Sequence, residues 1–460
     1  MAKQPAITLL IKPASGSCNL RCRYCFYADE MNIRSERTYG MMSLETLDTL
    51  VEKTLNQVTH MATFAFQGGE PTLAGLDFYR SLIEIEKKHN HKGIEIHNSL
   101  QTNGIVIDEE WAQFLHDNQF LVGLSLDGYQ ELHDENRKFP DGTGSFGRVM
   151  ETARLFQKYQ VEFNILTVVT AQSARRIRRT YQFFESQGFT YQQYIPCIDP
   201  FEENKGSLSY SLTPDRYGKF LKDLFDYWYQ DWKEGHPVYN RTFENWIGML
   251  HNYPPESCNM MGICSEQWVV EADGSVYPCD FYVLDEWKLG NIRTASFEEM
   301  NEKREELDFV SLSRHVPDKC RDCRWYPLCR NGCRRDRELL PDGRTPGLNS
   351  YCASYQDFFS YAYPRMLDFK CQERAFFPGC SRFCPESGVC LHPRMPLLQR
   401  ILLRMSSLYW LLLLYQILLR MPPESAALLL SCRRPGIGCG RPWRRFSDHG
   451  LPSSRPCPAH

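Results

Sequence analysis

Short apolar runs alternate with longer amphipathic stretches over about the first 200 residues of the chain. The amphipathic stretches favour helices, and the apolar runs favour strands because they are short and rich in β-branched residues. This alternation is typical of βα units around a parallel sheet. The strand candidates are Ile7–Ile11, Thr63–Phe66, Glu95–Leu100, Leu121–Leu126, Phe163–Val169 and Tyr191–Ile195. Six repeats predict an α/β fold in the form of a partial (β/α)6 barrel rather than a closed eightfold one.

Polar residues that precede the amphipathic stretches predict where helices begin. Ser43 is a candidate N-cap for a helix that runs to about Val58, because a side-chain oxygen there accepts from a free backbone N–H. Asp108 and Ser173 are candidate starts of later helices for the same reason.

Length and composition predict a cytoplasmic protein of more than one domain. A chain of 460 residues exceeds what a single core usually organises. The net charge of -3 argues against a dedicated nucleic-acid binder. No signal-peptide pattern precedes the first strand candidate, and the 19 cysteines cluster in ligand spacings. Reduced, metal-bound thiolates are therefore favoured over a disulfide framework.

The composition changes after Lys370. From there the chain has no lysine, asparagine or threonine but twelve arginines and seven cysteines. We therefore expect residues 369–460 to be an atypical, frameshifted or non-native tail without a part in catalysis. Cys380, Cys384 and Cys390 are an alternative metal site within it. The apolar run 408–419 is shorter than the roughly 20 residues that a membrane-spanning helix needs, so no membrane span is predicted, and interfacial association is the alternative.

Three cysteines follow the first strand candidate. Cys18, Cys22 and Cys25 have the C-x3-C-x2-C spacing that places three thiolates around one [4Fe–4S] cluster and leaves one iron open. With Tyr24 before the last cysteine, the motif resembles the signature of the radical S-adenosylmethionine (SAM) superfamily. A zinc knuckle is the alternative. In the predicted barrel, the triplet lies at the carboxyl end of the sheet, where α/β folds place their chemistry.

A glycine pair follows the second strand candidate, in Phe66-Gln-Gly-Gly-Glu-Pro71. Glycines permit a close backbone approach, although most such pairs are simply turns. In the superfamily that the chain resembles, such a segment holds the amino group of SAM. By this match, Gly68, Gly69 and Glu70 are SAM contacts.

Polar groups also follow the third and fourth strand candidates, in Gln101-Thr-Asn-Gly104 and Ser125-Leu-Asp-Gly128. Both segments are alternatively ordinary turns. The resemblance implies SAM contacts from Ser125, Arg137, the backbone near Ile198 and the main chain of Tyr24. A buried Arg137 would bind the SAM carboxylate bidentately, whereas the alternative is an arginine on the surface.

Eight cysteines form a second block downstream, enough to ligate two cubane clusters completely. They are Cys258, Cys264, Cys279, Cys320, Cys323, Cys329, Cys333 and Cys352. The block resembles the SPASM extension of radical-SAM enzymes, and structural zinc is the alternative. Strand candidates Trp268–Glu271 and Ser275–Tyr277 flank Ala272-Asp-Gly274 and predict a hairpin that positions Cys279.

The family resemblance, and not the spacing, implies how the ligands are divided. One auxiliary cluster would take Cys258, Cys264, Cys279 and Cys333, and the other Cys320, Cys323, Cys329 and Cys352. The expected organisation is a radical-SAM partial barrel over 1–235, then a small cysteine-rich SPASM domain with a C-terminal helix over 236–368, which binds two auxiliary clusters.

Longer matches point to one family. They are Ile11-Lys-Pro-Ala14, Cys25-Phe-Tyr27, the segment from Phe64 to Gly75, the segment from Asn98 to Gly104, and Asp273-Gly-Ser-Val-Tyr-Pro-Cys-Asp-Phe-Tyr282. Over about residues 5 to 368, they resemble the anaerobic sulfatase-maturating enzymes, whose chain would end near residue 370.

The resemblance implies a reaction. SAM cleavage at the reduced cluster would give a 5′-deoxyadenosyl radical, which takes a hydrogen from the β-carbon of a cysteine or serine in a sulfatase polypeptide. Asp280 would accept the thiol or hydroxyl proton, and the product would be Cα-formylglycine. Gln67 and Tyr27 are candidates for holding the substrate. A solvated loop carboxylate is the alternative for Asp280, and packing of the barrel mouth is the alternative for the other two.

The expected cofactors are SAM and three [4Fe–4S] clusters, which make the chain a radical-SAM oxidoreductase that modifies a protein. The expected partners are an unfolded or nascent sulfatase polypeptide with a Cys/Ser-x-Pro-x-Arg motif and an electron donor such as flavodoxin or ferredoxin. A SPASM-type enzyme that modifies another peptide is one alternative. A non-catalytic iron–sulfur protein is another, which the predicted SAM pocket argues against.

Overall fold

The computed structural model describes residues 3–376. The chain divides into two compact units, Met1–Leu367 and Asp368–His460. Of the second unit, only the end of helix α15 is described. The cysteines predicted as a metal site at 380–390 and the apolar run 408–419 lie outside the described residues. Within the described part, no helix is both long and apolar enough to cross a membrane.

Six parallel strands form the centre of the first unit, and each pairs with the next along the chain. They are β1 (Gln4–Ile11), β2 (Val58–Phe66), β3 (Glu95–Thr102), β4 (Leu121–Ser125), β5 (Phe163–Val169) and β6 (Tyr191–Pro196). Fully buried side chains lie mainly on one face of these strands, among them Leu9, Phe64 and Leu124. The predicted α/β fold is confirmed, and each strand includes most or all of its predicted run.

The sheet continues beyond these strands at both edges. The short strand β7 (Tyr239–Asn240) pairs with β6. At the other edge, β8 (Trp268–Val270) pairs in parallel with β1. The predicted hairpin is confirmed, because β9 (Ser275–Tyr277) pairs antiparallel with β8. Strand β10 (Gly290–Asn291) then pairs with β9. The sheet therefore joins both sides of the domain boundary expected after residue 235, and that division stays a prediction.

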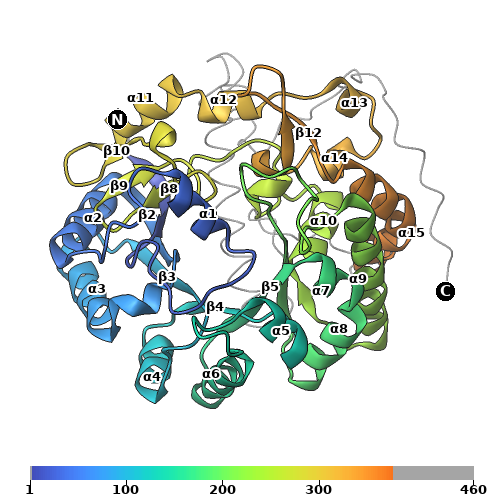
Figure 1. The fold of residues 1–460 in the computed structure, drawn as a ribbon, viewed down its shortest axis with the longest axis horizontal. Coiled ribbons are helices and arrows are strands. Elements are labelled where there is room, and N and C mark those ends of the chain that lie inside the picture. The colour runs from blue at the N-terminus through green and yellow to red at the C-terminus, as the bar shows by residue number, and fades with distance from the viewer. Residues whose placement is uncertain (1–2, 377–460) are drawn as a thin grey trace, which may run out of the picture. The chain divides into compact units, whose positions relative to one another are not determined.

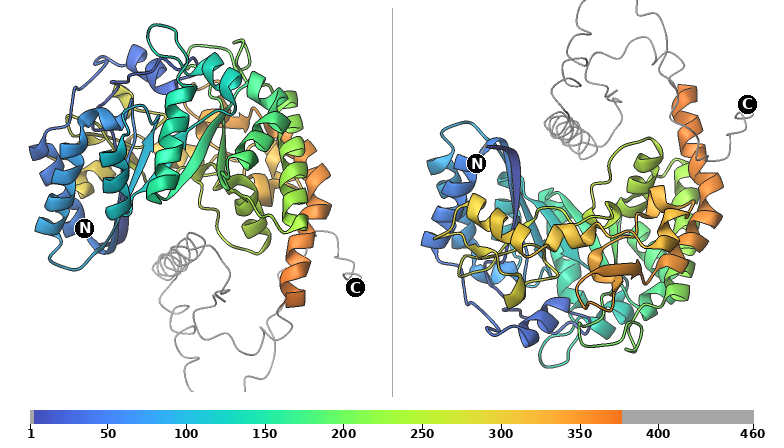
Figure 2. Two further views of the ribbon diagram at one scale, coloured as in Figure 1. Left: turned by 90° about the horizontal axis from the view of Figure 1, so that it is seen from below. Right: turned by 90° about the horizontal axis from the view of Figure 1, so that it is seen from above.

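Helices cover the outer face of the curved sheet (Figures 1 and 2). They are α2 (Leu44–Gln57), α3 (Leu76–His89), α4 (Glu109–Asp117), α5 (Gln130–Asn136), α6 (Phe146–Tyr159), α7 (Ala171–Arg175), α8 (Ile177–Ser186), α9 (Pro214–Glu234) and α10 (Arg241–Leu250). The short helix α1 (Phe26–Ile33) instead packs against Leu10 and Val269, which lie on the opposite face of the sheet from Leu9.

Two predicted helix starts are confirmed and one is wrong. Ser43 and Asp108 cap α2 and α4 by accepting from backbone N–H groups. Ser173 is not a cap: it lies inside α7, whose N-cap is Thr170. The two side chains form a capping box, in which Thr170 accepts from the Ser173 N–H and the Ser173 side chain bonds back to the cap. Serine is favourable both at the N-cap and three residues later, so the residue type alone did not show where the helix begins.

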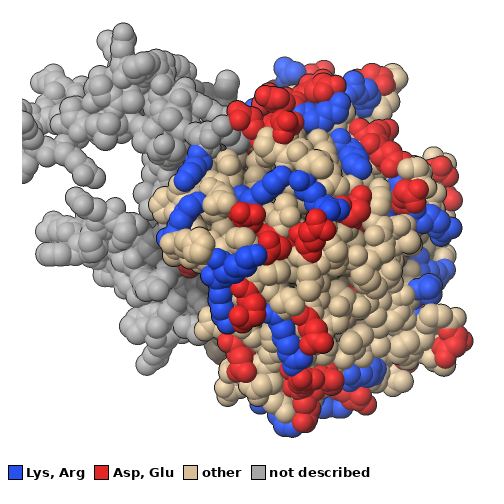
Figure 3. All heavy atoms as spheres, turned by 90° about the vertical axis from the view of Figure 1, so that its left-hand side faces the viewer, with Lys and Arg blue, Asp and Glu red and all other residues tan. Residues whose placement is uncertain are grey.

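The cysteine-rich part spans the open side of the partial barrel, from the β1 edge to α10, in yellow and orange at the top of Figure 1 and in Figure 2. Its elements are short: α11 (Phe297–Glu306), α12 (Phe309–Ser313), α13 (Asp318–Arg321), α14 (Tyr326–Cys329), β11 (Arg337–Leu339) and β12 (Pro346–Asn349). The exception is α15 (Cys352–Phe376). On the face drawn in Figure 3, acidic and basic side chains are interspersed.

Candidate functional site

The first cysteine motif forms the loop between β1 and α1. Backbone hydrogen bonds hold the loop against the end of α5 and the residues after it. The N–H groups of Arg21 and Arg23 donate to the carbonyls of Lys138 and Asn136 at 2.7 and 2.9 Å. Cys25 is the N-cap residue of α1. A helix N-terminus favours negative charge, which suits a thiolate at that place.

Burial dominates the chemistry of these thiols. It raises the pKa of Cys18 to about 11 and of Cys22 to about 12, and the mutual repulsion of the thiolates acts in the same direction. Such a group holds its thiolates only when a positive core binds them. The Cys18 sulfur also accepts from the Leu20 N–H at 3.4 Å and lies 3.7 Å from the Asn103 amide nitrogen. Three converging thiols with N–H donors fit an iron–sulfur cluster.

The glycine pair packs against this cysteine loop. The Gly69 N–H donates to the Ser15 carbonyl and the Glu70 N–H to the Ser17 carbonyl, both at 2.8 Å. A β-carbon on Gly69 would lie 2.2 Å from the Ser17 carbonyl oxygen, and Gly68 has a φ of +129°. The close approach that glycine permits is therefore made to the cysteine loop itself. The SAM contacts of both glycines stay predictions.

The Glu70 carboxylate joins the loops after β2 and β3. It accepts from Thr72, from the Thr102 hydroxyl at 2.7 Å and from the Asn103 N–H at 2.8 Å. Burial raises its pKa, and these donors oppose that rise. The side chain thus has an internal role beside the SAM contact predicted for this residue.

Arg137 is buried beside the cysteine loop and is not a surface arginine. Its Nε donates to Asp127 at 3.1 Å, and a terminal nitrogen lies 4.0 Å from the Cys22 sulfur. The Tyr24 hydroxyl donates to the same carboxylate. Ser125 is buried at the end of β4, and the Ile198 carbonyl lies 3.9 Å from the Cys197 sulfur. Ser125 and Ile198 thus lie at or just after strand ends, whereas Arg137 directly follows helix α5. The SAM contacts of these residues stay predictions.

Asp280 lies in a bonded group and is not a solvated loop carboxylate. Lys12 donates to its Oδ1 at 2.5 Å, and the Gln67 amide donates to its Oδ2. The Lys12 side chain is 0% exposed and that of Asp280 is 11% exposed. Lys12 comes from the end of β1, Gln67 from the end of β2 and Asp280 from the segment after β9. The structure therefore brings two predicted site residues, Asp280 and Gln67, into contact.

Tyr27 lies beside this group with its hydroxyl already engaged. The hydroxyl donates to Glu271, which also binds Arg34 at 2.7 Å. The Lys12 ammonium lies 3.9 Å from the centre of the Tyr27 ring. Burial raises the pKa of Glu271 to about 7. The predicted substrate contact of Tyr27 is therefore with its ring face or after a rearrangement of this hydrogen bond.

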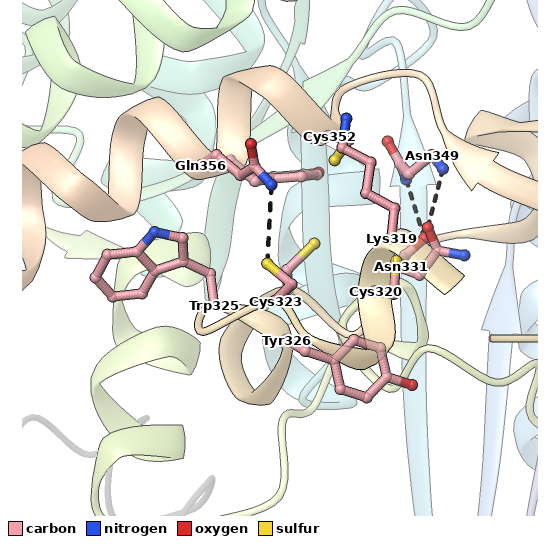
Figure 4. Close-up of a pocket in the computed structure, with 11 residues that line it drawn as sticks. Lys319, Cys320, Cys323, Trp325, Tyr326, Asn331, Asn349, Cys352 and Gln356 are labelled. Atoms are coloured by element: carbon pink, nitrogen blue, oxygen red, sulfur yellow. Dashed lines mark hydrogen bonds between the residues drawn. The ribbon is translucent and has the colours of Figure 1, made fainter. Parts of the chain in front are cut away.

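The structure brings the two predicted cysteine sets together as separate groups. In the first set, burial raises the pKa of Cys279 well above the usual range. Repulsion from the thiolates of the other three members raises it further. The four cysteines of the second set line one small hollow. Figure 4 shows Cys320, Cys323 and Cys352 around this hollow, where the Gln356 amide lies 3.8 Å from the Cys323 sulfur. Both arrangements fit four-thiolate clusters, and the ligand roles stay predictions.

Sequence reasoning missed three charged residues of the site: Lys12, Asp127 and Glu271. Lys12 lies in Ile11-Lys-Pro-Ala14 and Asp127 in Ser125-Leu-Asp-Gly128, two segments that are predicted to matter for other reasons. A charged residue directly after an apolar strand was the available signal. Lys12 and Glu271, however, lie 268 and 237 positions along the chain from their partners Asp280 and Arg34, and Asp127 also binds Tyr24 across 103 positions.

Each of the two cysteine regions matches a known protein family. Residues 13–184 match the radical SAM superfamily, and residues 258–324 match SPASM, an iron–sulfur cluster-binding domain.

Curated relatives match most of the chain. A cysteine-type anaerobic sulfatase-maturating enzyme of Clostridium perfringens is 49% identical over 364 residues, which cover 79% of this chain and 98% of the relative. A serine-type anaerobic sulfatase-maturating enzyme of Bacteroides thetaiotaomicron is 33% identical over 376 residues, which cover 78% of this chain and 90% of the relative.

Solved structures agree with these matches. Native anSMEcpe with bound AdoMet and Kp18Cys peptide superposes with a TM-score of 0.76 at 49% identity, over 80% of this chain and 100% of that one. Streptococcus suis SuiB bound to precursor peptide SuiA superposes with a TM-score of 0.52 at 16% identity, over 73% of each chain. That second likeness concerns the fold alone.

Proposed function

The chain belongs to the anaerobic sulfatase-maturating enzymes of the radical SAM superfamily, and on this premise we propose how its own residues serve the reaction. The enzyme is an oxidoreductase that converts a sulfatase side chain to Cα-formylglycine without O2. It uses SAM and a [4Fe–4S] cluster, and its SPASM domain binds auxiliary clusters. We infer that cysteine is its substrate side chain, because identity is 49% to a cysteine-type relative and 33% to a serine-type one.

One contact carries the assignment of residues. Lys12, six residues before Cys18 in the chain, bonds to Asp280, which follows Cys279. The end of β1 therefore leads both to the SAM-cluster loop and to the proposed base. The reaction needs both at once, because the substrate β-carbon must lie on the SAM side while the base acts on the sulfur bonded to it.

The loops after the strands, together with Arg137 at the end of α5, would bind the cofactors. Cys18, Cys22 and Cys25 would ligate the SAM cluster. The residues that would bind SAM are Arg137, Ser125, Glu70 and the main chain of Tyr24, Gly68, Gly69 and Ile198. The auxiliary clusters would take Cys258, Cys264, Cys279 and Cys333 in one case and Cys320, Cys323, Cys329 and Cys352 in the other. When bound, these groups supply the hydrogen-abstracting 5′-deoxyadenosyl radical and the acceptor for the second electron.

Asp280 would accept the proton of the substrate thiol. Its carboxylate must be ionised for this, and the Lys12 ammonium at 2.5 Å stabilises the negative charge. Both oxygens are engaged in the structure. The thiol therefore reaches a carboxylate oxygen when the Gln67 amide turns away to bind the substrate. Loss of one hydrogen atom, one proton and one electron oxidises cysteine to a thioaldehyde, which water hydrolyses to the aldehyde with release of hydrogen sulfide.

The partner is a sulfatase polypeptide, and we propose that it is recognised unfolded or nascent through a Cys-x-Pro-x-Arg motif. We also propose a small electron donor of the flavodoxin or ferredoxin class. The twelve cysteines from Cys18 to Cys352 form no disulfide, which supports the cytoplasm as the compartment, since disulfides are rare there.

Anaerobic incubation of the reconstituted enzyme with SAM, a strong reductant and a Cys-x-Pro-x-Arg peptide tests the function. Mass spectrometry of the peptide and the nucleoside should show an aldehyde in place of the cysteine together with 5′-deoxyadenosine. A protein with full iron content that makes 5′-deoxyadenosine but leaves the peptide unaltered would refute the assigned substrate. A serine peptide, measured in parallel, reports the side-chain preference.

A further inference from the structure

Three arginines directly after the cluster cysteine Cys333 are buried. The exposed fractions are 4% for Arg334, 9% for Arg335 and 3% for Arg337. Arg334 and Arg335 lie in a short 3-10 helix, Arg334–Asp336, and Arg337 begins β11. We call these three residues the arginine group.

The guanidinium groups donate to backbone carbonyls. Arg337 donates to the carbonyls of Gly262, Ser313, Asn331 and Gly332 at 2.7–3.0 Å. Arg334 donates to the Phe309 carbonyl at 2.8 Å and Arg335 to the Asp199 carbonyl at 2.6 Å.

Aromatic rings supply further contacts. The guanidinium carbon of Arg334 lies 4.6 Å from the centre of the Phe309 ring, and that of Arg335 lies 3.7 Å from the centre of the Phe201 ring. Carbonyls and ring faces are neutral partners, so they do not cancel the charges.

Within the described residues, no carboxylate forms an ion pair with any member of the arginine group. The buried arginines on the SAM side differ, since Arg34 pairs with Glu271 and Arg137 with Asp127. An arginine stays charged even when burial lowers its pKa, as it does for Arg337.

The nearby Asp336 does not balance these charges. Burial raises the pKa of its carboxyl group, and three cations, Lys205, Arg335 and Arg337, act on it together. A single carboxylate leaves this group of cations with an excess of positive charge. Buried charges without sufficient counter-charge are costly, so a further anion is expected beside them.

The four cysteines of the first auxiliary set supply that anion. The backbone N–H of Arg335 donates to the sulfur of Cys333 at 3.4 Å, so the arginine group begins directly at a ligand of this set. The carbonyls that Arg337 binds belong to ligand loops, because Gly262 lies between Cys258 and Cys264, and Gly332 directly precedes Cys333. In a complete cluster, four thiolates outweigh the positive charge of the iron–sulfide core, and reduction adds a further negative charge.

We propose that Arg334, Arg335 and Arg337 are the built-in counter-charge of the auxiliary cluster ligated by Cys258, Cys264, Cys279 and Cys333, and raise its reduction potential. The inference rests on the proposed function only for the ligand set. Nearby positive charge stabilises the reduced cluster more than the oxidised one, because the reduced cluster is the more negative. This cluster is thereby adapted to accept the electron that the substrate gives up.

The second auxiliary set has a different environment. The cations next to its ligands in sequence, Lys319, Arg321 and Arg324, are not buried. Water and salt screen exposed charges. The Gln356 amide, shown in Figure 4 beside Cys323, is a neutral donor. Among the three arginines, Arg337 also acts on Cys320 of this set. The unequal effect on the two auxiliary clusters is therefore expected from Arg334 and Arg335.

Arg335 is the member to change first, because its side chain makes a single hydrogen bond, to the Asp199 carbonyl. Redox titration of the reconstituted enzyme, followed by EPR without SAM or peptide, gives the midpoint potential of each cluster. Replacing Cys18, Cys22 and Cys25 by alanine in the same protein removes the SAM-cluster signal. Gln356→Leu then identifies the second auxiliary cluster, whose potential alone it should change.

Arg335→Gln should make the other auxiliary potential more negative. At a fixed potential the ratio of reduced to oxidised cluster should fall about tenfold, which is about 59 mV for one electron. Arg335→Lys keeps the charge and should stay close to the parent protein. Arg304→Gln is the matched control, because Arg304 is also buried and its guanidinium carbon lies 4.4 Å from the centre of the Trp268 ring. The charged group that acts on Arg304 is Glu266 and not a cluster cysteine.

Equal shifts in the glutamine and lysine variants, or no shift in either, would overturn the proposal. If the glutamine variant loses iron and the lysine variant keeps it, iron content shows that the charge is required. If both lose iron, the role is packing and the proposal fails. Peptide conversion does not enter these measurements, so failure of the proposed function would be seen separately.

Discussion

Lys12 is the central residue on the substrate side of the site. It is fully buried, bonds to Asp280 at 2.5 Å and lies against the Tyr27 ring. A buried ammonium is tolerated only with a counter-charge and further contacts. The carboxylate that we propose as base is thus also the group that keeps Lys12 stable in the protein. Catalysis and stability are therefore coupled at this pair.

Asp280→Asn should abolish formylglycine while cluster iron and SAM cleavage persist. It should also lower the thermal midpoint, because breaking a buried ion pair costs about 3–5 kcal/mol. Adding Lys12→Met should restore much of the midpoint without restoring product. Peptide mass spectrometry, iron analysis and thermal unfolding check this prediction. Aldehyde formation by the single variant would show that Asp280 is not the base.

His133 predicts a pH effect at the SAM side. Burial lowers its pKa from the usual 6.5 to about 3, and the neutral ring bonds the Asp127 N–H and the Ser145 hydroxyl. The unfolded chain binds a proton at higher pH than the folded one, so stability falls as pH drops from 6.5 towards 3. The loss between pH 7 and pH 5 should be about 2 kcal/mol.

His133→Gln keeps a donor and an acceptor without titrating. Its thermal midpoint should therefore fall less than that of the parent protein between pH 7 and pH 5. Equal falls in the two proteins would assign the pH effect to other groups.

Among the elements, the loops at the carboxyl ends of the strands are hydrogen-bonded to each other. The loop after β2 donates to the cysteine loop after β1, and Glu70 bonds to the residues after β3. The glycine pair was predicted from its backbone freedom, and that freedom serves the contact with Ser15 and Ser17. One loop thus positions the next across the end of the sheet.

Gly69→Ala should displace the cysteine loop, because the added carbon would lie 2.2 Å from the Ser17 carbonyl oxygen. The SAM cluster should be lost and the auxiliary clusters kept, so iron per chain should fall by about a third. Gly147→Ala is the control, since a carbon there meets nothing within 4 Å. Full iron content in Gly69→Ala would contradict this account of the loop.

At the scale of the whole molecule, one sheet joins the barrel to the cysteine-rich part. Strand β8 pairs with β1, the strand that leads to both Lys12 and the SAM-cluster loop. The hairpin of β8 and β9 leads in turn to Cys279 and Asp280. A continuous sheet fixes the distance between these groups more firmly than two domains joined by a linker would.

Removing residues 377–460 should leave peptide conversion unchanged. The Clostridium perfringens relative is matched over 98% of its length by 79% of this chain, so the family's reaction does not depend on the remainder. The cut after Phe376 keeps α15 whole. Conversion rate and iron content of the shortened and full chains check the prediction. Lower conversion at equal iron content would assign the tail a part in the reaction.

Local pattern was sufficient for the strands, for two of three helix starts and for the grouping of cysteines by spacing, because these depend on neighbours in sequence. Ser173 shows the limit, since two nearby hydroxyls both suit a helix start. The division of the eight downstream cysteines required the family resemblance, because their two sets interleave along the chain.

By itself, the sequence determined the order of βα units, the cysteine spacings and the family that both indicate. Only the tertiary structure decided what each charge does. Lys12 meets Asp280 across 268 positions, and Tyr24 meets Asp127 across 103. The arginine group has the sequence pattern of a basic surface run, yet it is buried. Burial and partnership of a charge depend on which distant segments fold against it, and no local pattern of residues encodes that.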